Sequence, residues 1–133
     1  ARRSGRSARG GARQAGEQRI LDGWVAAACE VLRAAFDEHV AEVEDEEGLL
    51  PQLRADEPRL DHAVHQMYEE HIEIGAAVSA LVEVVVGCGD ACDADTIARV
   101  RRAGVELLRM ISLHRQAGAD LIYNAYSVDI GGG

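Results

Sequence analysis

The sequence predicts an all-α protein, built as an up-and-down bundle of long helices. Apolar residues recur at alternating steps of three and four over three long stretches, which is the period of an amphipathic α-helix. The chain has 133 residues and only two prolines, whereas a β-sandwich needs a turn about every 8–12 residues. This length suits one domain with one modest core.

The first predicted helix covers residues 17–47. Gly48 supplies a stop at its C-terminal end, and a short apolar connector, residues 49–53, follows. The apolar positions of this helix step by four and three, and they are Leu21, Val25, Ala28, Leu32 and Ala35.

Two further helices follow the connector. The second is expected to begin near Asp56, a candidate N-cap, with Pro58 in its first turn, where the missing N–H costs nothing. It ends at Gly87, and the third helix runs from near Asp95 to the glycines 131–133. The strict spacing on both helices favours near-parallel packing. The fourth helix of a bundle could come from the connector, from a preceding segment or from a partner chain.

Charge divides the chain at residue 16. Residues 1–16 hold five arginines, no acid and no apolar face, which predicts a disordered tail. Residues 17–133 form the helical domain, and their nine arginines and 23 acids give a net charge of −14. Nucleic acid is not an expected partner of so acidic a body. The chain has no run of about 18 apolar residues and its tail has no signal-like apolar stretch. We therefore expect no membrane span and a cytoplasmic location.

The most informative feature is what interrupts the apolar stripes. Each predicted helix carries one histidine on its core-facing line, namely His39, His71 and His114. A buried imidazole needs a hydrogen bond or a metal. The depths of the three residues along their helices agree only to within about two or three turns. A shared metal site and three separate core histidines therefore both stay open.

Carboxylates follow His39 at the end of the first helix. Helical periodicity places Glu42 and Glu46 on the same side of the first helix as His39. An acidic run at a helix C-terminus opposes the helix dipole, a cost that a bound cation would offset. Gly75 and Gly118 each lie four residues after a core-facing histidine, which leaves room for a small ligand or for close helix packing.

Three short motifs, in this order, resemble those of the hemerythrin-like (HHE cation-binding) family. They are His39-Val-Ala-Glu-Val-Glu44 before Gly48-Leu-Leu-Pro51, the pair Glu70-His71, and His114-Arg-Gln-Ala-Gly-Ala-Asp120. The resemblance covers roughly residues 24–129. It implies a four-helix bundle around a non-haem di-iron centre that binds O₂ or related small molecules. It also implies the ligands His39, Glu44, His71 and His114, with Asp120 as a weaker match.

The sequence also departs from the family pattern, in which a histidine is followed by glutamate four residues later and two histidines lie four apart. The residues four after the three core-facing histidines are Val43, Gly75 and Gly118. A five-histidine di-iron site cannot be assembled obviously from this chain. A mononuclear site, a carboxylate-rich dinuclear site and a metal-free bundle stay open.

The first functional hypothesis is therefore an iron-binding bundle that binds or senses a small ligand such as O₂, peroxide or NO. Its expected metal ligands are His39, Glu44, Glu46, His71 and His114, with one coordination position open and apolar side chains excluding water. One alternative is a metal-free interaction module, which as a homodimer would complete a four-helix core. Another is a di-iron oxidase, so whether the protein is an enzyme is left open.

Overall fold

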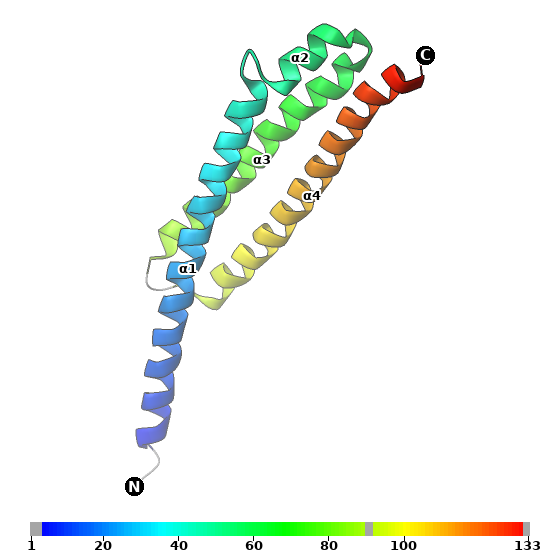
Figure 1. The fold of residues 1–133 in the computed structure, drawn as a ribbon. Coiled ribbons are helices and arrows are strands. Elements are labelled where there is room, and N and C mark those ends of the chain that lie inside the picture. The colour runs from blue at the N-terminus through cyan, green and yellow to red at the C-terminus, as the bar shows by residue number, and fades with distance from the viewer. Residues whose placement is uncertain (1–3, 90–91, 132–133) are drawn as a thin grey trace.

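The computed structural model describes residues 4–89 and 92–131, with side chains for residues 10–12, 23–89 and 92–127. Its elements are all helical (Figure 1). They are α1 Ser4–Glu44, α2 Leu49–Asp56, the 3₁₀ turn η1 Pro58–Leu60, α3 Asp61–Cys88 and α4 Ala94–Gly131. No strand occurs within the described residues, so the predicted all-α class is confirmed.

α3 is the central helix, because it packs along α1 and also along α4. Figure 1 shows the chain passing along α1, turning through α2 at one end, returning along α3 and reversing again into α4. The three long helices therefore alternate in direction. This arrangement is consistent with a bundle, and α2, formed by the predicted connector, adds a fourth, short helix to it.

α1 differs from the predicted first helix at both ends. It begins at Ser4, so residues 4–16, where the sequence predicts a disordered tail, continue the same helix. Arginine, alanine and glutamine are good helix formers, whereas the prediction of a tail rests on the glycines and the missing apolar face. α1 ends at Glu44, and the Gly48 N–H donates to the Asp45 carbonyl at 2.7 Å. A Cβ at Gly48 would lie within 2.8 Å of three carbonyl oxygens, so only glycine fits this turn.

The start of the next long helix also differs from the sequence prediction. Asp56 ends α2 instead of capping α3, and Pro58 lies in the first turn of η1. α4 begins at Ala94, close to the predicted start near Asp95, and Asp93 caps it, because its Oδ1 accepts the Thr96 N–H at 2.7 Å. At its other end α4 reaches Gly131, while the predicted stop at residues 132–133 lies outside the described residues.

Two apolar clusters form the core. The cluster nearer α2 consists of Leu50, Leu53, Leu60, Val64, Met67, Leu121 and Ala125. The second consists of Cys29, Ile74, Val78, Leu81, Val82 and Leu107. Along α3, Met67 belongs to the first cluster and Ile74 to the second, and His71 lies between them with 5% of its surface exposed. The apolar core is therefore divided in two, and the polar side chain of His71 lies between its two parts.

The sequence predicts no membrane span, but the segment Pro58–Cys88 is long and apolar enough to cross a membrane. Core helices of soluble proteins pass the same test. Here α3 packs against two other helices and places the buried His71 at its middle, which is how a core helix is used. Cys88, the last residue of α3, forms a disulfide with Cys92 before α4 begins.

Candidate metal centre

The three core-facing histidines meet between the two apolar clusters. His39 comes from α1, His71 from α3 and His114 from α4, and one ligand atom of each lies within 4.8 Å of the other two. Their ring centroids are 5.3 Å apart for His39 and His71, 5.7 Å for His39 and His114, and 4.8 Å for His71 and His114. The structure thus brings to one level the three residues whose depths the sequence leaves open.

The three imidazoles differ in their exposure. The His71 side chain is 3% exposed and that of His114 is 11% exposed, whereas His39 is exposed. Phe36, one turn before His39 on α1, packs its ring edge-on against His71, with centroids 6.1 Å apart. The cluster is therefore closed on the side of α3 and reaches solvent on the side of His39.

Glu44 orients the imidazole of His71. Its Oε1 lies 2.8 Å from Nδ1 of His71. An ionised carboxylate can only accept hydrogen bonds, so Nδ1 of His71 carries the proton of this hydrogen bond, and Nε2 is the nitrogen left for another partner. The resemblance implies Glu44 as a metal ligand, whereas the structure places its carboxylate against Nδ1 of His71.

Glu70 stands in the same relation to His114. Its Oε1 lies 3.3 Å from Nδ1 of His114, a longer contact than that of Glu44. α3 therefore supplies both the central histidine and the carboxylate that orients the histidine of α4. Glu70 is absent from the predicted ligand set, although it stands beside His71 in one of the motifs that carry the family resemblance.

The surroundings of His39 and His114 favour the neutral form of these two imidazoles. Burial is the main cause that lowers the pKa of His39, and the nearby His114 lowers it further, against the opposing effect of Glu42 and Glu44. Burial and the neighbouring His71 likewise lower the pKa of His114, against Glu70. A neutral imidazole is the form that binds a metal, so little proton release is needed for these two residues to act as ligands near neutral pH.

The donor set fits one metal ion. Nitrogens bound to a single Zn²⁺ or similar ion at about 2.1 Å lie roughly 3–4 Å apart, and the three ligand atoms here lie within 4.8 Å of one another. A small closing movement, available to the exposed His39, would bring them to bonding distance. Three imidazoles suit zinc, copper or iron. The histidines could thus hold a metal ion, whose identity the geometry leaves open.

The other candidate residues lie away from the cluster. Glu46, past the end of α1, is exposed, and the structure does not bring it to the histidines. Asp120 is exposed and accepts a hydrogen bond from Gln116 at 3.0 Å. His65, which is not one of the predicted ligands, pairs with Glu69 on the surface of α3, with Nε2 3.1 Å from Oε1. Of the five predicted ligands, three form the cluster and Glu44 hydrogen-bonds one of them.

A groove of about 570 Å³ opens beside the cluster, and all three histidines line it. Apolar side chains from all four α-helices form its walls, and they include Leu32, Phe36, Leu50, Met67, Ile111, Leu121 and Ile122. Arg115 is the only charged residue among those that line it, histidines aside. A Cβ added to Gly118 would meet nothing within 4 Å, so this glycine leaves room in the groove and is not a point of close helix packing.

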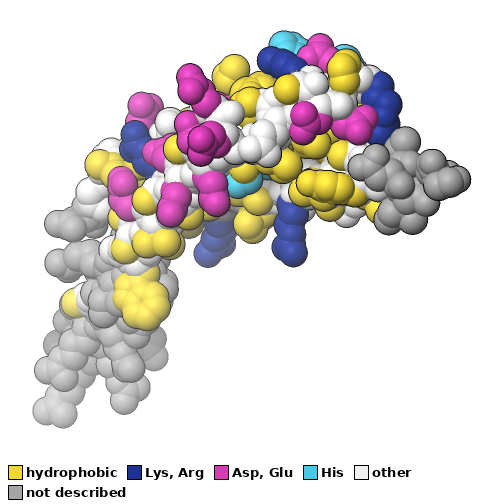
Figure 2. Space-filling model, turned by 45° about the horizontal axis from the view of Figure 1, so that its top comes forward, with side chains coloured by type: hydrophobic (Ala, Val, Ile, Leu, Met, Phe, Trp, Pro, Cys, Tyr) yellow, Lys and Arg dark blue, Asp and Glu magenta, His cyan; other side chains and the backbone are white. Residues whose placement is uncertain are grey.

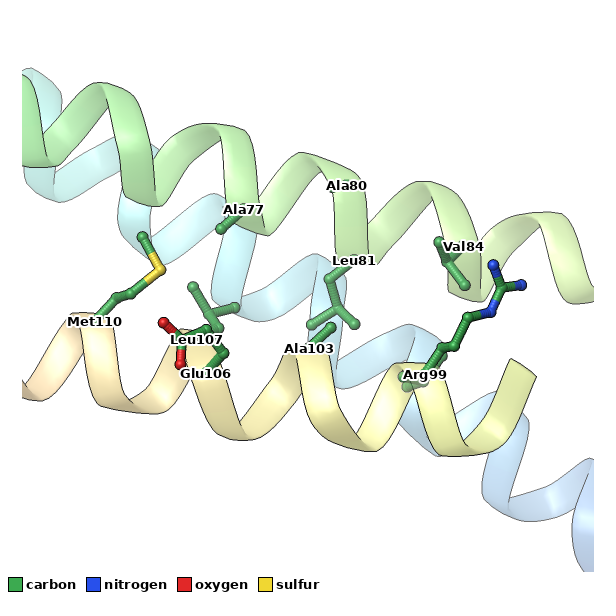
Figure 3. A pocket seen from close by; sticks show the side chains of 10 residues that line it. Ala77, Ala80, Leu81, Val84, Arg99, Ala103, Glu106, Leu107 and Met110 are labelled. Atoms are coloured by element: carbon green, nitrogen blue, oxygen red, sulfur yellow. The ribbon is translucent and has the colours of Figure 1, made fainter. Parts of the chain in front are cut away.

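A smaller hollow of about 270 Å³ lies between α3 and α4 and is shown in Figure 3. Small residues of both helices, among them Ala77, Ala80 and Ala103, leave it open, and no histidine lines it. Glu106, at its edge, is ion-paired with Arg109 on the same helix. This hollow is therefore a gap in helix packing, with none of the ligand chemistry of the groove.

One face of the molecule carries many acidic and apolar side chains. Figure 2 shows acidic side chains gathered along one side of the molecule, with a histidine visible among apolar side chains beside them. No family model, curated protein or solved structure matches this chain. The assignment of the site rests on its geometry, and membership of the hemerythrin-like family stays a prediction.

Proposed function

We propose that this protein is a non-haem iron protein that binds or senses O₂ or a related small molecule such as peroxide or NO. The observation that supports it is the histidine cluster, in which three helices each bring one ligand atom within 4.8 Å of the others. Two of the imidazoles are backed by carboxylates, Glu44 on His71 and Glu70 on His114. Such carboxylates fix the tautomer and the ring orientation of histidine ligands in metal sites.

A metal also accounts for the buried lone pair of His71. Nε2 of this residue accepts no hydrogen bond among the described residues, while Nδ1 is used by Glu44. A buried acceptor without a partner costs free energy, and a cation at the centre of the cluster would satisfy three such nitrogens together. The two carboxylates would balance the charge of a divalent ion.

The proposal of iron and a small ligand draws on the donor set, the groove and the family resemblance. Three protein ligands leave at least one coordination position of a metal open, and bound iron would supply the binding site for the small molecule there. Leu32, Phe36 and Ile111 line the adjoining groove and would limit the access of water. No carboxylate is among the residues that line the groove, so an acid–base pair for turnover is not provided there. Binding or sensing is therefore the proposed role.

The test is anaerobic loading of the tag-free protein with Fe(II), followed by titration with NO. We expect an absorption band that saturates at an equimolar ratio of NO to chain. His114→Ala removes a ligand and should abolish the band, while His65→Ala, which alters a surface histidine, should leave it unchanged. Retention of the band in His114→Ala would place the iron elsewhere.

A second candidate function is a metal-free helical interaction or dimerisation module. It is favoured by the large apolar side chains that α1 and α4 expose, since Trp24 is 76%, Val31 69% and Leu108 65% exposed. Monomeric soluble proteins rarely leave large apolar patches uncovered. Sedimentation and thermal melting in chelator separate the two candidates, because a metal-free module stays associated and melts unchanged when metal is removed.

A further inference from the structure

We propose that the groove beside the histidines binds an apolar monocarboxylic acid, with its carboxylate at Arg115 and its hydrocarbon part along the apolar walls. This inference rests on the proposed metal centre for the second of two anchors, since the carboxylate would lie beside the metal as well. It names a class of ligand larger than the diatomic molecules considered above.

The charge of the groove is the first argument. The whole chain has 23 acids against 14 basic residues, yet the groove is lined by Arg115 and three histidines and by no acid. Three other arginines of the described chain, among them Arg54 and Arg109, are held in ion pairs with carboxylates. No ion pair of Arg115 is found within the described residues. Its planar guanidinium, able to bind a carboxylate through two parallel hydrogen bonds, is thus available to a ligand.

The size and the walls of the groove are the second argument. Its volume of about 570 Å³ lies within the range of about 300–1,000 Å³ found for small-molecule sites, so it holds far more than O₂. Apart from the histidines and Arg115, its lining is apolar, so a polyhydroxylated or multiply charged ligand would lose water without gaining partners. A ligand with an apolar body and one negative group would pack against the apolar walls and pair with the guanidinium of Arg115.

The position of Arg115 is the third argument. It directly follows His114 on α4, and both residues line the groove. A carboxylate held by this arginine therefore lies in the same groove as the histidines. A metal with an open position accepts carboxylate oxygen readily, so the two anchors reinforce each other. A protonated amine at the same place would be repelled by both.

The experiment compares three probes that share one chain and differ in the head group, namely decanoate, decan-1-ol and decylamine. Binding is measured by calorimetry to the Zn(II)-loaded and to the metal-free protein, with metal content determined on the same samples. We expect decanoate to bind at least about tenfold more tightly than decan-1-ol, as for one hydrogen-bonded charge pair, and decylamine to bind least. Zinc should strengthen the binding of decanoate and leave that of decan-1-ol unchanged.

Two substitutions locate the ligand. Arg115→Gln should remove the preference for decanoate over decan-1-ol, while Arg102→Gln, an exposed position of α4 outside the groove lining, should keep it. Gly118→Leu fills the groove without changing a charge, so it should weaken all three probes. Gly118→Ala, whose Cβ meets nothing within 4 Å, should weaken none of them.

Equal affinity for decanoate and decan-1-ol in the metal-loaded protein would overturn the inference and leave the metal centre intact. So would a protein that binds none of the probes and sediments as a dimer, because a second copy would then cover the groove. Selective, Arg115-dependent binding of decanoate to a protein that takes up no metal would support the ligand class and overturn the proposed function.

Discussion

Nδ1 of His71 lies 2.8 Å from Oε1 of Glu44, so the last residue of α1 orients the imidazole at the middle of α3. α1 thus contributes to the cluster twice, through the ring of His39 and through this carboxylate. Because the contact joins two helices, the orientation of a buried imidazole depends on how α1 and α3 pack. This relationship makes the site sensitive to residues that do not touch the proposed metal.

Glu44→Gln removes the charge behind His71 and keeps the shape of the side chain. We expect the affinity for Zn(II) or Fe(II) to fall about 10–100-fold, the usual effect of losing such a carboxylate. Glu46→Gln is the matched control, since Glu46 is exposed and lies outside the cluster. Competition with a chelating dye measures both variants. Equal losses in the two would show that only the overall charge of the acidic segment matters.

Glu70→Gln should weaken metal binding in the same direction but by a smaller factor. Its Oε1 lies 3.3 Å from Nδ1 of His114, against 2.8 Å for the Glu44 contact, so it holds the ring less firmly. Glu69→Gln, which changes only the surface pair with His65, should have no effect. A larger loss for Glu70→Gln than for Glu44→Gln would contradict the geometry given above.

The metal-free protein should lose stability as the pH falls below about 6.5. The pKa of His39 and that of His114 lie below the ordinary value of 6.5 in the folded state. Between the unfolded and folded values the unfolded chain binds more protons, so the free energy of unfolding decreases as the pH is lowered through this window. Urea denaturation at about pH 7.5 and about pH 5.5 measures the change, before carboxylates titrate.

His114→Gln removes one of these two titrating groups, so its stability should depend less on pH over the same window. Chelator is present throughout, so that metal loss does not add to the effect. A free energy of unfolding that is constant or rises as the pH falls would mean that the imidazoles are not held neutral by the fold.

Ile74→Ala should destabilise the protein by about 2–5 kcal/mol, because it opens a cavity in the apolar core one helical turn from His71. Ile74 is 2% exposed, while Ile72, two residues earlier on the same helix, is 73% exposed. Ile72→Ala should therefore change stability by no more than about 0.5 kcal/mol. Similar losses from both substitutions, measured by chemical denaturation, would contradict the burial of α3 described here.

The long helices could be predicted from the sequence, while their ends could not. Apolar spacing alone indicates three helices, but where a helix stops depends on local turn chemistry, such as the backbone contacts that only Gly48 permits. The cap of α4 by Asp93 is a local contact of the same kind. α2 is eight residues long, which is too short for a repeating stripe to show, so it reads as a connector.

The site could be predicted in part for a related reason. His39, His71 and His114 interrupt three apolar stripes, and this pattern marks them without any structure. The partners of their Nδ1 atoms depend on how neighbouring helices pack, so Glu70 has no sequence signal beyond its place beside His71. The groove depends on how the side chains of all four α-helices pack against one another, which helical periodicity does not encode.

The most direct test of the central claim is the metal content of the tag-free protein, measured as purified and after anaerobic addition of Fe(II). The account predicts about one iron per chain, as for a single three-histidine site, lost in His71→Ala and kept in His65→Ala, with helicity checked in both. A wild-type protein that takes up no metal, or a His71→Ala variant that holds as much iron as the wild type, would contradict it.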